Sequence, residues 1–285
     1  MTKVMSYPRL FSVVMTLSLS FSSLSAQAAE RLLTIGGAVT EIVYALGKGD
    51  EIIANDITSY YPEAANKVPK VGYMRTLSAE GLLSMRPTLI IADAGAGPLN
   101  VLEQIRSAGV KVIQLQEGFT PEHVATNIRL IGKQLQAANT EKVAAQYEDA
   151  WQETAAKVAA LKNNPRVLFV LDHTGKNPQA AGDETAANAI IKLIHADNVM
   201  MKQFKGYKPL TAESMVAAAP EVIITTYEGV QASGGLEVFL DKPGLRMTPA
   251  GKAKRVISLD SLLLLGFTPR LPNLVADLSK AVRQP

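Results

Sequence analysis

Residues 77–91 read LSAEGLLSMRPTLII, and residues 210–224 read LTAESMVAAAPEVII. The two stretches share leucine, alanine, glutamate, proline and a final pair of isoleucines in register. Each has a polar start, an apolar pattern of helical spacing, a proline and a short apolar run, which predicts a helix followed by a strand. Because the unit occurs twice, it indicates a duplicated α/β lobe, whereas a solenoid would need more repeats.

Short apolar runs alternate with helical patterns around both copies. This alternation predicts parallel or mostly parallel sheets. Ligands of such sheets bind beyond the carboxyl ends of the strands, so two facing lobes are expected to enclose one cleft. The runs expected to form strands are residues 32–37, 51–55, 89–93, 111–116, 166–172, 222–226 and 255–260.

Residues 121–163 interrupt this alternation. They contain no strand pattern, and their apolar residues keep helical spacing on both sides of Asn139-Thr140, which marks a joint or kink. We therefore predict an α/β protein with two Rossmann-like lobes, residues 29–120 and 164–285, joined by a long backbone helix over residues 121–163.

The first 28 residues have the pattern of a cleaved secretory signal. Lys3 and Arg9 supply the positive region, residues 10–25 are apolar and rich in serine, and Ala26-Gln27-Ala28 fits a cleavage site between small residues. A membrane anchor is the alternative, but the apolar part is short for one. The chain contains no cysteine to carry a lipid, form a disulfide or bind a metal. A free periplasmic protein is expected.

The charge of the chain is nearly balanced. It has 29 Lys+Arg and 26 Asp+Glu residues, and the predicted leader contains two of the basic ones. This balance predicts no general attraction to nucleic acid or to anionic lipid.

Both copies of the repeat place a glutamate in the first turn of the expected helix. Glu80 follows Ser78, and Glu213 follows Thr211, and the two polar residues have the character of helix N-caps. An acid at this position stabilises a helix through its dipole by ~0.3–1 kcal/mol. Duplication alone would also repeat it, and so would a shared role on the surface of both lobes. Both interpretations stay open on the residues alone.

The segment VGYMR, residues 71–75, contains a candidate ligand for iron. In an extended chain Tyr73 and Arg75 point to the same side. A nearby guanidinium favours the phenolate, and a phenolate oxygen is a ligand for ferric iron, including haem iron. The alternative is an ordinary interfacial tyrosine, since the chain has eight tyrosines.

The three histidines form no cluster in the sequence. His123 lies near an expected helix start and His195 near a helix end, and both are expected to be structural. His173 follows the predicted strand 166–172, where a cleft residue would lie. The glycine-rich stretch ADAGAGPLN, residues 92–100, lacks the known phosphate-binding spacings and predicts a tight turn at the cleft edge.

Taken together, these features resemble the class III periplasmic binding proteins, which deliver ferric siderophores, cobalamin or haem to ABC importers. The similarity covers essentially the whole chain after the leader. The segments IGGAVTEIVYALG (35–47), VGYMRTLSAEGLLSMRPTLIIA (71–92) and LDHTGKNPQAAG (171–182) are most similar to the haem-binding branch.

The resemblance implies roles for the candidate residues. Tyr73 would be the axial ligand of ferric haem (iron protoporphyrin IX), with Arg75 as its charge partner, and His173 would supply a second axial ligand or hold a second stacked haem. Glu80 and Glu213 would dock on arginines of the membrane permease subunits. The resemblance also implies a monomer without enzymatic activity, supplied with haem by an outer-membrane haem receptor system.

Other functions remain as alternatives. A ferric-siderophore or cobalamin carrier would use the same fold, but a siderophore supplies its own iron ligands and needs no tyrosine from the protein. A periplasmic metalloenzyme or a zinc-uptake protein would need converging histidines and carboxylates, which the scattered histidines do not offer.

Overall fold

The computed structural model describes residues 1–2, 30–172, 178–209 and 211–284. The predicted leader and His173 therefore lie outside the described residues, apart from the first two positions. Within the described part of the chain, no helix has the length and apolar character needed to cross a membrane.

The first lobe is a four-stranded parallel sheet with helices around it. Its strands lie in the order β2-β1-β3-β4, and every neighbouring pair is parallel. The elements are β1 Leu32–Ile35, α1 Gly37–Ala45, a 3-10 turn Gly49–Glu51, β2 Ile52–Asn55, a 3-10 turn Glu63–Lys67, α2 Ala79–Ser84, β3 Leu89–Ala92, α3 Leu99–Ser107 and β4 Lys111–Gln114.

The second lobe repeats this order and extends it. The strands β7, β5, β9 and β10 are parallel neighbours in the same arrangement, and β6 and β8 are added antiparallel at the far end of β5. The elements are β5 Arg166–Leu171, β6 Gln179–Ala181, α6 Ala186–Leu193, β7 Asp197–Asn198, β8 Tyr207–Pro209, α7 Ala212–Ala218, β9 Val222–Thr226, α8 Tyr227–Ala232, α9 Leu236–Leu240, α10 Pro249–Lys252, β10 Val256–Leu259, α11 Ser261–Leu265 and α12 Leu271–Ala281.

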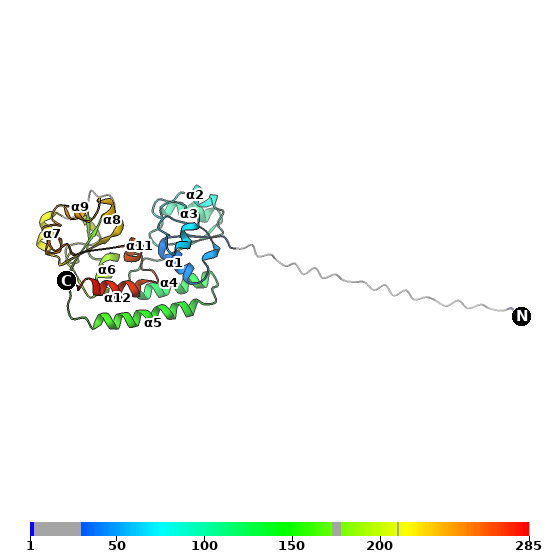
Figure 1. Ribbon diagram of the computed structural model, residues 1–285. Helices are drawn as coiled ribbons and strands as arrows, with labels where there is room; N and C mark the ends of the chain where they lie inside the picture. Colours follow the sequence, from blue (N-terminus) through cyan, green and yellow to red (C-terminus); the bar gives the residue numbers. More distant parts are fainter. Residues whose placement is uncertain (3–29, 173–177, 210, 285) are drawn as a thin grey trace.

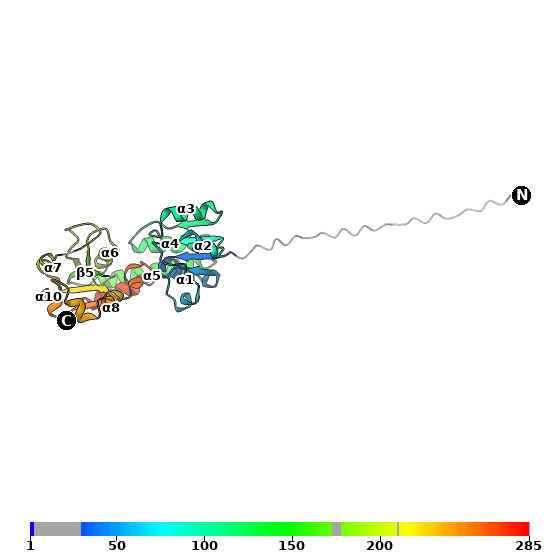
Figure 2. The ribbon, with the colours of Figure 1, turned by 90° about the horizontal axis from the view of Figure 1, so that it is seen from above.

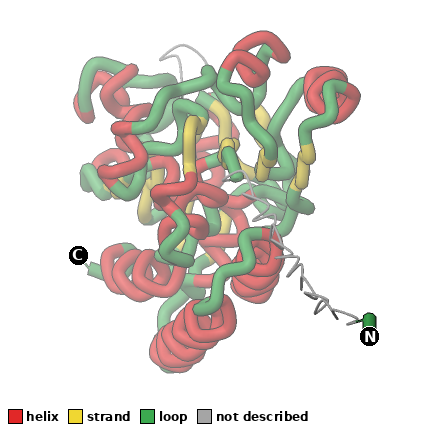
Figure 3. Tube along the Cα trace, turned by 90° about the vertical axis from the view of Figure 1, so that its right-hand side faces the viewer, coloured by secondary structure: helices red, strands yellow, loops and turns green. Residues whose placement is uncertain are grey.

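Three helices form a common base beneath the lobes. The linking span consists of α4 Pro121–Gln134 and α5 Thr140–Ala159, so the joint predicted at Asn139-Thr140 is a break between two helices. The long α5 runs under both lobes (Figure 1), α4 packs on α5 and on α1, and α12 packs on α5. The lobes lie side by side when seen from above (Figure 2), and an end view shows the strands above the base helices (Figure 3).

The alternation of side chains along the strands produces three hydrophobic cores. In β3, Leu89 and Ile91 face a core that is shared with the base helices, whereas Ile90 faces a second core within the first lobe. In β5, Phe169 faces the shared core and Leu168 faces a third core within the second lobe. Both faces of each sheet are therefore buried, as parallel strands require. The shared core joins the lobes through α4, α5 and α12.

The repeated stretch forms the same structure twice. Ser78 caps α2 by accepting the Gly81 N–H at 3.0 Å, and Thr211 caps α7 by accepting the Ser214 N–H at 3.2 Å. After each helix the chain turns through a left-handed residue, Arg86 at φ 50° and Ala219 at φ 43°. It then enters β3 or β9. The duplication predicted from sequence is confirmed down to the backbone turn.

All seven predicted strands are present, within one or two residues at their ends. The expected α/β fold of two Rossmann-like lobes is therefore confirmed. Sequence reasoning missed β6, β7 and β8, which have two or three residues each and carry no period-2 pattern. One of them, β8, contributes Tyr207 to a wall of the cleft.

Candidate functional site

A cleft of about 750 Å³ lies between the lobes. Residues directly after the strand ends line it, including Gly36 after β1, Asp93 after β3, Leu115 after β4 and Ser261 after β10. The carboxyl ends of both sheets therefore converge on one cavity, as expected for open α/β sheets. Its volume lies in the range of small-molecule and cofactor sites.

The part of the cleft nearest the base is apolar. Phe119 from the first lobe meets Phe267 from the second, with ring centroids 5.6 Å apart and planes tilted by 48°. Tilted aromatic pairs of this kind are attractive beyond the area that they bury. Other apolar lining residues include Ile42, Leu115, Leu171, Leu262 and Leu265. This region would accept a flat apolar ligand.

Tyr73 is held over the cleft by a loop that is fixed on both sides. On one side the Val71 N–H donates to the Asn55 carbonyl at 2.9 Å, and on the other the Gly97 N–H donates to the Met74 carbonyl at 2.8 Å. Gly72 takes φ 99°, a conformation that favours glycine. The Tyr73 side chain lines the cleft, is 40% exposed, and makes no hydrogen bond to another described residue. Its phenol is free to meet a ligand.

Arg75 also lines the cleft, as the sequence predicted, but the local chain is a turn. The Thr76 N–H donates to the Tyr73 carbonyl at 2.9 Å, so the segment is not extended. The Arg75 guanidinium lies against Gly95, whose absent Cβ would be 3.2 Å from the nearest nitrogen. It forms no hydrogen bond with the Tyr73 phenol in this structure. A glycine at position 95 is what leaves room for the guanidinium.

The glycine-rich turn after β3 carries the Asp93 carboxylate, whose pKa is influenced by the charge of Arg75. Asp93 accepts the Gly95 N–H at 2.8 Å, which closes the tight turn predicted from the sequence. Burial raises the pKa of Asp93, while the bond from Gly95 and the charge of Arg75 oppose this rise. Arg75 and Asp93 therefore both lie on the wall of the first lobe, close enough for their charges to interact.

The wall of the second lobe comes from the added strand β8, from the segment between β6 and α6, and from the start of α6. Glu184, Thr185 and Tyr207 line the cleft here. Burial raises the pKa of Tyr207, and the Arg75 guanidinium on the opposite wall is close enough to oppose part of that rise. Glu228 also lines the cleft and accepts the Ser261 hydroxyl at 3.1 Å. None of these residues was singled out by sequence reasoning.

Two polar ties join the lobes beside the cleft. Arg270 donates to both oxygens of the buried Glu41 carboxylate, at 2.8 and 2.5 Å, and its guanidinium stacks on Tyr61 with 3.8 Å to the ring centroid. The Tyr60 hydroxyl accepts the Leu262 N–H at 3.1 Å. These contacts span the junction above the shared core and oppose relative motion of the lobes.

The other candidate residues lie elsewhere. Glu80 and Glu213 are exposed in the first turns of α2 and α7, and neither lines the cleft. His195 follows α6, as expected for a structural residue. His123 does line the cleft, and its Nε2 bonds to the Gln116 carbonyl at 2.9 Å. Within the described residues there is no group of three or more His, Cys, Asp or Glu side chains arranged to hold a metal ion.

Comparison with known proteins places these features in context. A family model described as periplasmic binding protein matches residues 33–263. The apo structure of the periplasmic haem-binding protein RhuT from Roseiflexus sp. RS-1 has a TM-score of 0.86 and 36% identity, covering 89% of this chain and 98% of its own. The structure of the periplasmic haem-binding protein BhuT with two haems has a TM-score of 0.84 and 43% identity, covering 89% and 97%.

A curated relative of different specificity is also similar. The vitamin B12-binding protein of Vibrio parahaemolyticus is 25% identical over 267 residues, which is 93% of this chain and 94% of that protein. This chain is therefore similar over most of its length to binding proteins of different specificity. Its sequence identities to RhuT and BhuT are higher than its identity to the vitamin B12-binding protein.

Proposed function

The chain belongs to the periplasmic binding protein family, and from that premise we propose that it captures ferric haem in the periplasm and delivers it to an ABC permease of the inner membrane. The observation that carries this proposal is the cleft itself. A free phenol on a fixed loop lines a cavity of about 750 Å³ between the lobes, part of which is apolar. Haem is a flat, mostly apolar molecule whose iron needs an axial ligand, and this cavity offers both features.

Tyr73 is the proposed axial ligand of the haem iron. Its loop is fixed by hydrogen bonds on both sides, so the oxygen is presented to the ligand with little reorganisation. Arg75 is its proposed charge partner. Its guanidinium lies against Gly95 on the cleft wall, and its charge would favour the phenolate that forms on iron binding. His173, outside the described residues, remains the proposed second ligand.

Delivery requires a partner that recognises both lobes. Permeases of ABC importers are the partners of this family, and we propose that Glu80 and Glu213 are the docking residues. Both are exposed, both lie in equivalent first turns, and neither takes part in the cleft. A carboxylate fixed in this way can accept a bidentate bond from an arginine.

We also propose the finer features of the transport system that the sequence led us to expect. The leader of residues 1–28 is removed, and the mature protein is a free periplasmic monomer that receives haem from an outer-membrane receptor system. Its working parts are a lobe of residues 29–120, the linking span 121–163 and a lobe of residues 164–285. Binding and transfer, with no chemical conversion, are the whole of its activity.

The proposed function is tested by ligand titration of the mature protein. Ferric haem, metal-free protoporphyrin IX, cobalamin and a ferric siderophore are added separately, and binding is followed by absorption and calorimetry. We expect haem to bind most tightly and the metal-free porphyrin more weakly, because the latter offers no iron to Tyr73. Preferential binding of cobalamin, the ligand of the relative from Vibrio parahaemolyticus, would contradict the proposal.

A further inference from the structure

The charge of the cleft does not match an anionic ligand. Four carboxylates line it, from Asp93, Glu117, Glu184 and Glu228, whereas Arg75 is the only lysine or arginine among the described lining residues. Haem carries two propionate groups, which are ionised at neutral pH. The lining residues supply one cation and the ligand has two propionates. One propionate is therefore left without a positively charged partner among the lining residues.

A second cation lies at the edge of the cleft, bonded to one of its lining residues. The Lys205 Nζ is 2.5 Å from the Glu184 Oε1, and Gly206, the next residue along the chain, itself lines the cleft. Both side chains are well exposed, at 72% for Lys205 and 61% for Glu184. The ammonium group is therefore open to solvent and reaches the cleft wall through the Glu184 carboxylate.

The backbone holds this pair in place from both sides. The Asp183 N–H donates to the Phe204 carbonyl at 2.8 Å, and the Gly206 N–H donates back to the Asp183 carbonyl at 2.8 Å. These bonds fasten the two segments on either side of the Glu184–Lys205 pair. The bridge between Asp183 and Lys205 continues the β6–β8 pairing up to the cleft.

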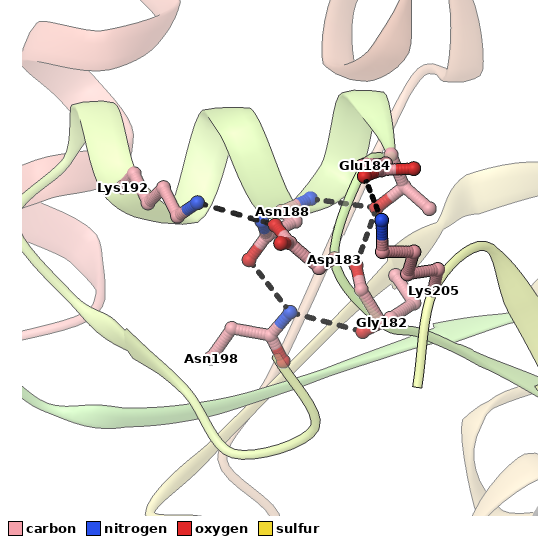
Figure 4. A network of polar contacts seen from close by, with 9 residues as sticks. Gly182, Asp183, Glu184, Asn188, Lys192, Asn198 and Lys205 are labelled. Atoms are coloured by element: carbon pink, nitrogen blue, oxygen red, sulfur yellow. Dashed lines mark hydrogen bonds and ion pairs between the residues drawn. The ribbon is translucent and has the colours of Figure 1, made fainter. Parts of the chain in front are cut away.

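Glu184 has a strained backbone at φ 58°, which an L-residue with a Cβ adopts rarely. A network next to it fixes this conformation: Asn188 and Lys192 bond to the Asp183 carboxylate at 2.8 and 3.3 Å, and Asn198 bonds to Asn188 at 3.0 Å (Figure 4). Non-glycine residues in this region of φ and ψ concentrate at binding sites, where the surrounding structure holds them. Glu184 combines this backbone conformation with a place on the cleft wall.

We propose that Lys205 is a carboxylate-binding residue of the second lobe, which receives one propionate of the bound porphyrin by releasing Glu184. The inference rests on the proposed function, since it assigns a part of the ligand to a part of the cleft. Each lobe then contributes one cation, Arg75 on the cleft wall of the first lobe and Lys205, bonded to Glu184, at the cleft edge of the second.

If Lys205 releases Glu184 to bind a propionate, substitutions of these two residues should have opposite effects on haem affinity. Removal of the lysine charge by Lys205→Gln takes away the propionate contact, so haem binding weakens. Removal of the competing carboxylate by Glu184→Gln frees the ammonium group, so haem binding strengthens. A pair that only stabilised the wall would give the same sign for both substitutions. Lys192→Gln is the matched control, because Lys192 pairs with Asp183, which does not line the cleft, whereas Lys205 pairs with Glu184, which does.

The experiment measures the dissociation constants of ferric haem and of its dimethyl ester, in which both propionates are neutral, for the wild type and the three variants. We expect Lys205→Gln to weaken haem binding by roughly three- to fivefold and Glu184→Gln to tighten it by about twofold, as for exposed ion pairs. Ester binding by both variants and haem binding by Lys192→Gln should equal the wild type.

Three results would overturn the inference alone: unchanged haem binding by Lys205→Gln, equal losses for haem and ester, or a loss of haem affinity in Glu184→Gln. A wild-type protein that binds neither porphyrin would overturn the proposed function and the inference with it. The two failures are therefore distinguishable in the same set of titrations.

Discussion

The two lobes are alike where they carry the repeated helix and different where they face the cleft. Strand order, N-cap, first-turn glutamate and left-handed exit are the same in α2 and α7 and the strands around them. At the cleft, the first lobe presents the loop with Tyr73, whereas the second presents the added strands β6 and β8 with Glu184 and Lys205. The two lobes are therefore alike at the surface around α2 and α7 and differ at the surface that faces the cleft.

This difference has a physical reason if the two faces meet different kinds of partner. A permease built from two like subunits would present the same surface to each lobe, which would keep the docking turns alike. A single porphyrin has one iron to be ligated and needs unlike groups on its two sides. The predictions that follow test this division, beginning with what holds the lobes together.

The largest effect is expected from the tie between Glu41 and Arg270. Arg270→Met should lower the free energy of unfolding by about 3 kcal/mol, because a buried carboxylate is left without its partner. Urea denaturation measures this, and Trp151 of α5, the only tryptophan, reports on the base helices.

Arg246→Met is the matched control, because Arg246 also pairs with two acidic residues but lies on the surface within the second lobe. We expect it to cost less than about 1 kcal/mol. Equal costs for the two arginines would show that the junction between the lobes is no stronger than an ordinary surface contact.

The docking turns should show equal effects in the two lobes. Glu80→Ala and Glu213→Ala should each slow haem uptake into vesicles that contain the matching permease by about two- to fivefold, and the double variant should be slower still. Haem affinity should not change, because neither residue lines the cleft. Glu63→Ala removes another exposed acid of the first lobe and serves as the control. A strong effect of one glutamate with none of the other would contradict a twofold docking surface.

A smaller effect is expected where α4 meets α5. Arg129 donates to both oxygens of Glu148, at 2.6 and 2.9 Å, and this bond lowers the pKa of Glu148 below 4.5. A lowered pKa stabilises the fold above the unfolded value, and this stabilisation is lost as the pH falls through the folded pKa. Glu148→Gln should therefore cost ~0.2–1 kcal/mol at pH 7 and less at pH 3.

Denaturation at the two pH values measures this difference. Asp149→Asn, on the neighbouring position of the same helix, should be neutral at both. A cost of Glu148→Gln that is as large at pH 3 as at pH 7 would mean that the side chain acts through packing and not through its charge.

The sequence predicted the parts of the molecule that depend on local patterns. Strand runs with both faces apolar, the two N-caps and the glycine turn at Asp93 each carry their signal within a few residues. Tyr73 and Arg75 were found in the same way, through their spacing, although the segment is a turn.

The missed features depend on residues that are distant in the chain or on strands too short for a pattern. Glu41 and Arg270 meet only because the lobes close over a shared core. Lys205 gains its place from β6 and β8, which pair three residues at a time and show no alternation. No local signal marks a lysine whose importance comes from a strained glutamate on another segment.

The central claim is that the first lobe supplies the iron ligand through Tyr73, and absorption spectra of the haem complex test it most directly. Tyr61→Phe is the matched control, since Tyr61 lies in the same connection between β2 and α2 with a similar exposure of 44% but does not line the cleft. Titration of ferric haem should give a tyrosinate-type spectrum for the wild type and for Tyr61→Phe. In Tyr73→Phe this spectrum should be lost, and binding should weaken by more than about tenfold. An unchanged spectrum in Tyr73→Phe would contradict the account.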